Sequence, residues 1–472
     1  MAITKGEQII KDWYQQKNWE QFAFQQEMMQ AYINGFSGLL NAPTGSGKTF
    51  AMFLPFIANY INQNPDNYQE KSNQGLLMLW ITPLRALTND IQKAMQTVVD
   101  DLGIPWKIAA RTGDTSSADK QAIKRKPPEV LLTTPESLHL MLAQKEYPKA
   151  FKNLQVVVTD EWHELLGTKR GVQLELGLSR LKSLRNKQET TKVATNTADH
   201  GLSTMDSLKI WGISATIGNL EEAKEVLLST LSKEGVIVKA NMKKQIVIES
   251  VLPDEMENYP WAGHLGLKLI HKLIPIIEKI TNTLIFINTR GMSERWYQEL
   301  LNHAPQLAGA IALHHGSIEQ ELRLWVEEAL HTAKLKAVVC TASLDLGVDF
   351  RPVETVIQVG SPKGVSRFLQ RAGRSGHSPD AVSKIYFLPT HSLELVEAAA
   401  LKSAIDENLI ESKEPMLLCF DVLTQYLNTL AISDGFRPDE LFNEIKSTYC
   451  FRELEQQEWN DVLQFLVEGG KA

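Results

Sequence analysis

The chain has 472 residues, 43% of them hydrophobic, which is too many for a single core and predicts two or three domains. Its three cysteines stand far apart with no CxxC pair, so neither a disulfide framework nor a zinc site is indicated and a reducing cytoplasm is expected. The N-terminus shows no signal-peptide core and no apolar run reaches roughly 18 residues, so we expect no membrane partner. A net charge of -7 weakens the case for a nucleic-acid partner without excluding it, because backbone N–H groups can contact phosphates as well as Lys and Arg.

Between about residues 37 and 235, short apolar segments alternate with longer amphipathic ones. The apolar segments, which we expect to be buried strands, are GLLNA, GLLMLWIT, EVLLT, LQVVVTD and LKIWGIS. Continuous apolar character indicates strands covered on both faces, as in a parallel sheet with helical crossovers. The stretch from Asn186 to Asp206 is polar and without periodicity, so it predicts a mobile surface loop.

The same alternation returns between about residues 281 and 389. The expected strands there are NTLIFINT, GAIALHH, KAVVCTA, ETVIQVG and SKIYFLP. After Pro389 only helical patterns remain, which predicts a small helical or winged-helix module. The chain stops at GGKA just as that module would close, and we interpret this end as a truncation. Two α/β domains in tandem, followed by a smaller module, are therefore expected.

A phosphate-binding loop is indicated by APTGSGKT, which lies between an expected strand and an expected helix and departs from the strict pattern only at Ala42. Its glycines would let backbone N–H groups wrap phosphates, its lysine would reach the β and γ phosphates, and its last hydroxyl would bind Mg²⁺. The residues expected to bind nucleotide here are Thr44, Gly45, Ser46, Gly47, Lys48 and Thr49. The alternative is a glycine-rich turn without a ligand.

Paired carboxylates follow the strand LQVVVTD. Asp160 there could hold Mg²⁺ through water, and Glu161 could polarise the attacking water. A helix cap would explain the same pair, but the phosphate loop upstream favours catalysis. Small hydroxyl residues at another strand end, Ser214 and Thr216, suit a hydrogen-bonded relay between the ATP site and the rest of the domain, although an ordinary turn fits them too.

Two arginines, Arg371 and Arg374, lie three residues apart in SRFLQRAGRSGH. Guanidinium groups from a second domain can act as arginine fingers on a γ-phosphate, and the flanking Gly373 and Gly376 favour close approach to a ligand. A solvated helix face is the alternative.

Four histidines have no neighbouring ligands at metal-binding spacing, so we expect polar links at a domain interface rather than a metal site. They are His163, His314, His315 and His377, of which the first would take part in the relay.

Six segments rich in Thr, Ser, Arg and Gly follow expected strands. Ligands of open α/β sheets bind at the carboxyl ends of strands, and these residue types donate hydrogen bonds to phosphates. Each segment alone fits a plain loop or helix cap, but six in two domains indicate a nucleic-acid surface. The expected contacts are Thr82, Pro83, Arg85, Thr112, Gly113, Thr134, Pro135, Thr289, Arg290, His315, Gly316, Thr341 and Ser343.

In this order, APTGSGKT, TPLRAL, TTPES, DEWH, SAT, HHGS, TASLDLGVD and QRAGRSGH resemble the superfamily 2 DExH-box helicases. GSPKGVSRFLQRAGRSGH and DEWHELLGTKRGVQLEL resemble more narrowly the large helicase-related group and its bacterial ligase-associated branch for the DNA damage response. The resemblance covers roughly residues 19 to 390. It implies an α/β fold of two tandem RecA-like domains, over 1–235 and 236–390, and an incomplete winged-helix-like module over 391–472.

The resemblance also implies 3′-to-5′ translocation on single-stranded DNA, coupled to hydrolysis of ATP or dATP with Mg²⁺, in DNA repair. By position in the motifs, Gln25 would recognise adenine beside Phe24 or Phe22, and Asp349 and Gln370 would line the nucleotide. The implied partners are single-stranded or tailed duplex DNA together with a DNA ligase and a repair nuclease, in the bacterial cytoplasm at the nucleoid.

Two other functions remain open from the residues. An RNA helicase would use similar phosphate contacts, because these do not distinguish DNA from RNA. A nucleotide-gated nucleic-acid-binding scaffold would bind nucleotide and nucleic acid without hydrolysing the nucleotide. Glu161 and the two arginines argue against this function, because a protein that only binds does not need a carboxylate that activates water.

Overall fold

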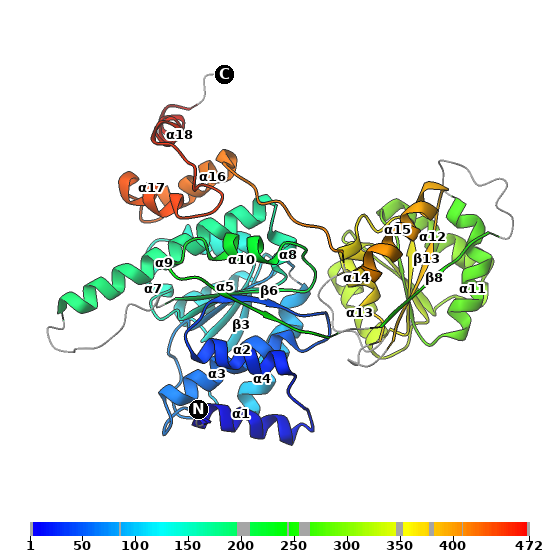
Figure 1. Ribbon diagram of the computed structural model, residues 1–472, viewed down its shortest axis with the longest axis horizontal. Coiled ribbons are helices and arrows are strands. Elements are labelled where there is room, and N and C mark those ends of the chain that lie inside the picture. Colours follow the sequence, from blue (N-terminus) through cyan, green and yellow to red (C-terminus); the bar gives the residue numbers. More distant parts are fainter. Residues whose placement is uncertain are drawn as a thin grey trace.

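A computed structural model of the chain describes residues 3–84, 86–195, 208–242, 245–253, 265–345, 353–376, 382–407 and 409–469. In this part of the chain, two parallel sheets form two separate α/β units, and three helices near the C-terminus lie over the first of them (Figure 1). The predicted fold class is confirmed.

The first sheet has the strand order β3-β4-β2-β5-β6-β1-β7, with every neighbouring pair parallel. Its strands are β1 (Gly38–Asn41), β2 (Met78–Ile81), β3 (Ile108–Arg111), β4 (Val130–Thr133), β5 (Val156–Thr159), β6 (Lys209–Ser214) and β7 (Val236–Lys239). The helices of this unit are α1 (Lys5–Gln16), α2 (Ala23–Ile33), α3 (Lys48–Gln63), α4 (Ala86–Asp101), α5 (Ser117–Arg125), α6 (Pro135–Leu142), α7 (Tyr147–Ala150), α8 (Trp162–Leu165), α9 (Lys169–Thr195) and α10 (Leu220–Leu228).

Apolar cores cover both faces of this sheet. In β2, Met78 and Trp80 belong to the core on one face, and Leu79 and Ile81 to the core on the other. Successive side chains of a strand point to opposite faces, so a strand buried on both sides must be apolar at every position.

The second sheet has the order β10-β11-β9-β12-β13-β8, again all parallel. Its strands are β8 (Ile246–Ser250), β9 (Thr283–Phe286), β10 (Ile311–His314), β11 (Ala337–Cys340), β12 (Thr355–Val359) and β13 (Ser383–Leu388). The helices of this unit are η1 (Leu265–Leu269), α11 (Ile270–Lys279), α12 (Arg290–His303), η2 (Pro305–Leu307), α13 (Gln320–His331), η3 (Ala342–Leu344), α14 (Val365–Ala372) and α15 (Leu393–Asp406).

The C-terminal helices α16 (Phe420–Ala431), α17 (Pro438–Lys446) and α18 (Gln456–Glu468) follow the second unit in sequence but pack on the first. Leu423 and Leu427 of α16 share one buried core with Leu142 of α6 and Leu178 of α9. An ion pair from α9 to α17 joins Arg180 Nη1 and Glu444 Oε2 at 3.0 Å. The chain therefore leaves the second unit and returns to cover the first.

Two predicted domain boundaries shift. β7 pairs with β1, so the first sheet extends beyond residue 235. α15 belongs to the second unit because Leu401 is buried in the core of the second sheet, so the C-terminal helical module starts later than residue 391.

The predicted loop from Asn186 to Asp206 is wrong in its first part, because α9 continues to Thr195. Lys and Glu favour helices, and Lys187 pairs with Glu440 of α17 at 2.5 Å, which supports a polar helix that no periodicity reveals. The remainder of the predicted loop lies outside the described residues.

All three cysteines are free and buried. Among the described helices, none combines the length and the apolar content that crossing a bilayer requires.

Candidate functional site

The phosphate-loop segment joins β1 to α3, as predicted. Gly45 and Gly47 adopt positive φ angles of 79° and 78°, which glycine tolerates and other residues rarely do, and the Ser46 hydroxyl donates to the Pro43 carbonyl at 2.7 Å. The turn therefore aims the N–H groups at the start of α3 toward the loop, where an anion would sit. The Lys48 ammonium has no hydrogen-bond partner among the described residues, although it is largely buried.

Gln25 packs against this loop from the side. Its Nε2 lies 3.5 Å from the Gly47 carbonyl oxygen, and its Oε1 accepts the Phe22 N–H at 3.0 Å. The rings of Phe22 and Phe24 stack nearly parallel beside it, with centroids 6.0 Å apart. This places the predicted adenine-binding group at the edge of the loop.

Two carboxylates face the loop from the end of β5. Glu161 Oε1 lies 3.7 Å from Lys48 Nζ, and Asp160 accepts from Trp80 Nε1 at 3.4 Å and from the Glu161 N–H at 2.9 Å. Glu161 has a positive φ of 47°, a conformation that costs energy for a residue with a side chain. The second oxygen of Glu161 is buried and has no hydrogen-bond partner among the described residues.

The two carboxylates have opposite pKa shifts. Burial, reinforced by the charge of Glu161, raises the pKa of Asp160 to about 7. Burial also acts to raise the pKa of Glu161, but Lys48, His163 and Arg374 outweigh it, and the net direction is down. Glu161 is thereby kept ionised, while Asp160 would gain from a nearby cation.

Mg²⁺ fits this arrangement through Thr49 and Asp160. Mg²⁺ bound with nucleotide normally takes only one or two protein ligands, with phosphate oxygens and water completing its shell. Within the described residues no cluster of three or more His, Cys, Asp or Glu side chains forms a metal site by itself. The buried carboxylate with a raised pKa is the observation that favours a cation here.

The second unit approaches the phosphate loop through the end of α14. A Cβ atom placed on Gly373 would lie 3.7 Å from Thr44 Cβ, so the two units touch at this loop. The positive charge of Arg374 acts on the carboxylate of Glu161. The Nη2 atom of Arg374 donates to the Asp345 carbonyl at 2.9 Å. Of the two predicted arginine fingers, Arg374 is the one placed beside the site.

Arg371 is bound inside the second unit in this structure, and its predicted role as an arginine finger stays a prediction. It is 1% exposed, and its guanidinium donates to both carboxylate oxygens of Asp345, at 2.6 and 3.0 Å, and to Gln358 Oε1 at 2.6 Å. The same group lies over the ring of Phe286, 4.7 Å from its centroid. All these partners belong to the second unit, so Arg371 holds that unit together.

The predicted relay residues meet across the two units. His163 Nδ1 lies 3.2 Å from Ser214 Oγ, and its Nε2 contacts the side-chain amide nitrogen of Gln370. Gln370 also donates to Thr216 Oγ1 at 3.2 Å, and Ser366 donates to the same oxygen at 2.7 Å. Burial lowers the pKa of His163, which favours the neutral ring that such hydrogen bonds need. In this structure Gln370 contacts the relay rather than lining the nucleotide.

The other predicted histidine links lie inside the second unit. His314 Nδ1 contacts Ser343 Oγ at 2.8 Å and its Nε2 lies 3.2 Å from Glu327, whereas His315 Nε2 lies 3.3 Å from Glu294. His377 lies outside the described residues.

The linker after α15 also joins the two units. The Glu411 carboxylate accepts the N–H groups of Val365 and Ser366 at the start of α14, the latter at 2.9 Å. Its backbone oxygen accepts the Gly218 N–H of the first unit at 3.1 Å. Sequence reasoning missed Glu411, Ser366 and Asp345; the last two stand inside quoted motifs, whereas no local pattern marks Glu411.

A groove of about 1300 Å³ runs between the two units. Its walls include Pro83 and Thr112 from the first unit and Gly316 and Ser343 from the second, all four predicted to contact nucleic acid. Its size and two-sided lining fit an extended chain better than a small molecule.

The remaining predicted contacts have mixed placements. Thr134 caps α6 by accepting the Ser137 N–H at 3.3 Å, and Pro135 follows it without an N–H of its own. Thr289 and Arg290 start α12, which has no side-chain cap, so backbone N–H groups there are available to phosphates. Thr82 is buried, and Gly113 accepts from Lys120 Nζ at 3.3 Å. Thr341 leads into η3. Arg85 and Asp349 lie outside the described residues.

Three family models match the chain in order. They are the DEAD/DEAH box helicase over residues 22–223, the helicase conserved C-terminal domain over residues 267–378, and the winged helix domain of the large helicase-related protein over residues 403–472.

Two further helicases are similar to the chain over nearly its whole length. The ATP-dependent helicase Lhr-Core of Methanocaldococcus jannaschii is 34% identical over 98% of this chain and 53% of its own length. The Lhr helicase/uracil glycosylase of Escherichia coli is 28% identical over 97% of this chain and 32% of its own length. The chain thus spans about half, or less, of the relatives it matches.

A solved structure of Mycobacterium smegmatis helicase Lhr, bound to single-stranded DNA and AMP-PNP, superposes with a TM-score of 0.78. It is 29% identical and covers 94% of this chain and 55% of its own. A DUF1998 helicase, MrfA, bound to DNA, has a TM-score of 0.71 at 22% identity, which indicates a shared fold.

Proposed function

Since the chain belongs to the Lhr-type superfamily 2 helicases, we propose that it is an ATP-driven motor that moves along single-stranded DNA. The observation that carries this proposal is the meeting of both units at the phosphate loop. Gly373 approaches Thr44, while the charges of Lys48 from the first unit and Arg374 from the second both act on Glu161. A nucleotide bound there would touch both units at once.

The residues divide the hydrolysis step between them. Lys48 and the N–H groups of the loop would bind the phosphates, and Gln25 would select adenine. Mg²⁺ held by Thr49 and Asp160 would neutralise charge on the phosphates. Glu161, kept ionised by its cationic neighbours, would accept a proton from the attacking water, and Arg374 would stabilise charge on the γ-phosphate.

Coupling to movement would run through the relay. With a γ-phosphate in place, Lys48 of the first unit and Arg374 of the second would both bind it, which favours the closed arrangement. When hydrolysis removes the γ-phosphate, the two units can separate. His163 reaches both Glu161, at 3.5 Å, and Gln370, so the state of the carboxylate and the position of α14 are linked. Opening and closing would move the two walls of the groove and step the strand along.

We include finer features in the same proposal: 3′-to-5′ polarity, use of dATP as well as ATP, action on tailed duplexes, and a role in DNA repair with ligase and nuclease partners at the bacterial nucleoid. The support for DNA is the groove itself and the single-stranded DNA bound by the similar M. smegmatis helicase.

The test is steady-state ATP hydrolysis without nucleic acid, with single-stranded DNA, and with single-stranded RNA of the same sequence. We expect strong stimulation by DNA. Glu161→Gln should lower turnover by about 10²- to 10⁴-fold while the DNA affinity stays near that of the wild type. Glu70→Gln, which makes the same change at an exposed position, should leave turnover unchanged.

Other outcomes decide between the alternatives. Stimulation by RNA alone would favour an RNA helicase, and nucleotide-dependent DNA binding without hydrolysis would favour a scaffold. Polarity is read from streptavidin on a biotinylated oligonucleotide: a 3′-to-5′ motor displaces it from the 5′ end, and displacement from the 3′ end alone contradicts that part of the proposal.

A further inference from the structure

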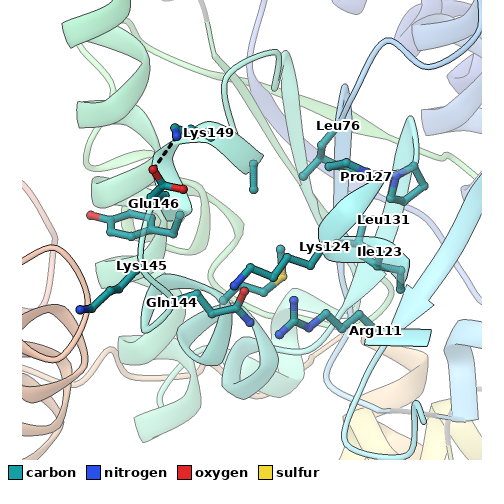
Figure 2. Close-up of a pocket in the computed structure, with 14 residues that line it drawn as sticks. Leu76, Arg111, Ile123, Lys124, Pro127, Leu131, Gln144, Lys145, Glu146 and Lys149 are labelled. Atoms are coloured by element: carbon teal, nitrogen blue, oxygen red, sulfur yellow. Dashed lines mark hydrogen bonds and ion pairs between the residues drawn. The ribbon is translucent and has the colours of Figure 1, made fainter. Parts of the chain in front are cut away.

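A second cavity, of about 300 Å³, lies in the first unit between α5, α6, α7 and the ends of β3 and β4 (Figure 2). It is separate from the phosphate loop. It shares only Ile123 of α5 with the groove between the units. A cavity of this volume is at the lower end of the range that holds small organic ligands.

The walls of this cavity are mostly carbon. Apolar side chains from four segments of the chain surround it, so an aromatic ring or an alkyl chain would be removed from water on binding. The apolar lining residues are Leu76, Ile123, Pro128, Leu131, Met141 and Tyr147.

A buried guanidinium extends into these carbon walls. Arg111, the last residue of β3, is 7% exposed, and its side chain points toward Lys124 and Gln144 (Figure 2). Among the described residues, no carboxylate or carbonyl forms a hydrogen bond or an ion pair with this guanidinium. The backbone oxygen of Arg111 accepts the Thr133 hydroxyl at 2.8 Å. Burial lowers the pKa of Arg111, in line with a charge that lacks compensation.

Positive charge also surrounds the mouth of the cavity. Lys124, Lys145 and Lys149 line it together with one carboxylate, Glu146, which pairs with Lys149 at 2.5 Å. This local excess of cations stands out on a chain whose net charge is -7. A buried, unpaired cation is costly, and an anion entering from this mouth would relieve that cost.

We propose that this cavity binds a small organic anion, with an aromatic or aliphatic body among the carbon walls and one acidic group on Arg111. The planar guanidinium can donate two parallel hydrogen bonds to a carboxylate, sulfonate or phosphate, which favours these groups over halide ions. The volume limits the body to one or two rings. The site is distinct from the ATP site and is independent of the proposed function.

The test compares two probes of the same shape, naphthalene-1-sulfonate and its neutral analogue naphthalene-1-sulfonamide. Both are titrated calorimetrically into the full chain with the ATP site saturated by AMP-PNP, so that aromatic anions do not enter that site. The wild-type protein should bind the sulfonate about tenfold or more tightly than the sulfonamide. Equal binding of the two probes, or no binding of either, would overturn the proposal without any variant.

Variants then locate the charge that matters. Arg111→Met keeps the aliphatic stem and should remove the preference for the sulfonate. Lys124→Gln at the exposed mouth should weaken sulfonate binding about threefold. Because Lys124 is exposed, this substitution should leave the fold intact, whereas Arg111→Met changes a buried residue. Lys126→Gln removes a neighbouring exposed charge that does not line the cavity, and it should bind like the wild type.

Thermal unfolding gives a second readout. The sulfonate should raise the melting temperature of the wild type and leave that of Arg111→Met unchanged, because only binding to the folded state stabilises it. A preference for the sulfonate that survives in Arg111→Met, or a loss in Lys126→Gln equal to that in Lys124→Gln, would assign the binding to general surface charge and refute the site.

Discussion

Gln370 of the second unit lies directly against His163 of the first, with its amide nitrogen at His163 Nε2 and a further hydrogen bond of 3.2 Å to Thr216 Oγ1. His163 in turn places Nδ1 3.5 Å from Glu161 Oε2. One side chain on α14 is thus two contacts away from the carboxylate proposed to activate water.

This contact predicts that Gln370→Ala uncouples the two units. The variant should keep its affinity for ATP but lose roughly tenfold of the DNA-stimulated turnover, since coupling between sites is commonly of that size. Turnover with and without saturating DNA measures the effect. Gln298→Ala on α12, where the amide donates to Asn302 at 3.2 Å within the same helix, is the matched control. Full DNA stimulation in Gln370→Ala would mean that the relay does not pass through this residue.

The two neighbouring arginines should fail in different ways. Arg371→Ala leaves the buried Asp345 without its bidentate partner and should lower the free energy of unfolding by about 3–5 kcal/mol. Arg374→Ala should instead lower ATP turnover by about 10³-fold, as loss of an arginine finger does. Urea unfolding and ATP turnover of both variants separate the roles. If Arg371→Ala unfolds at the wild-type urea concentration but has lost turnover, the predicted role of Arg371 as a finger is supported.

Most of the fold could be predicted because both sheets are buried on two faces. The strands that were missed, β3, β7 and β8, all lie at the edge of a sheet. An edge strand is covered less completely than a central one, and Lys239 at the end of β7 and Ser250 at the end of β8 are exposed. The apolar segment of such a strand is therefore shorter and harder to recognise in the sequence. The polar end of α9 was also missed. Lys187 there pairs with Glu440 of the C-terminal helices, and an ion pair to a distant segment gives no periodic apolar pattern in the sequence.

The candidate site was predictable where its chemistry is local. The phosphate loop and the carboxylates each occupy a few consecutive residues at a strand end, so their spacing identifies them. The orientation of an arginine is not local: Arg371 and Arg374 share one motif, and only packing against Asp345 and Phe286 separates their roles. The approach of Gln370 to His163, 207 residues apart in the chain, has no sequence signal of its own.

Glu411 provides a further prediction. Its carboxylate accepts two N–H groups at the start of α14, where a negative charge also stabilises the helix end. Glu411→Ala should therefore destabilise the start of α14 by about 1 kcal/mol and loosen the contact of Ser366 with Thr216. We expect kcat to fall several-fold while KM for ATP changes little. Glu414→Ala, at an exposed position of the same linker, should leave kcat unchanged, and an equal fall in both variants would show that the linker acts without this cap.

The docking of the C-terminal helices should depend on pH through Glu175. This carboxyl group of α9 is buried, accepts the Cys450 N–H at 2.9 Å, and has its pKa raised by burial from 4.5 to about 8. The folded state therefore keeps a proton that the unfolded chain releases above pH 4.5. The contribution of Glu175 to the free energy of unfolding is therefore fully present below pH 4.5. It falls as the pH rises and levels off above about pH 8.

The expected slope from this group approaches 1.4 kcal/mol per pH unit between those limits. Urea unfolding, followed by fluorescence at several pH values from 5 to 8.5, measures it as the difference between the wild type and Glu175→Gln. The amide of the variant can still accept the Cys450 N–H but cannot titrate, so its stability should change less with pH and exceed that of the wild type most clearly at alkaline pH. Parallel curves for the two proteins would show that Glu175 is ionised in the folded state and that another group opposes its charge.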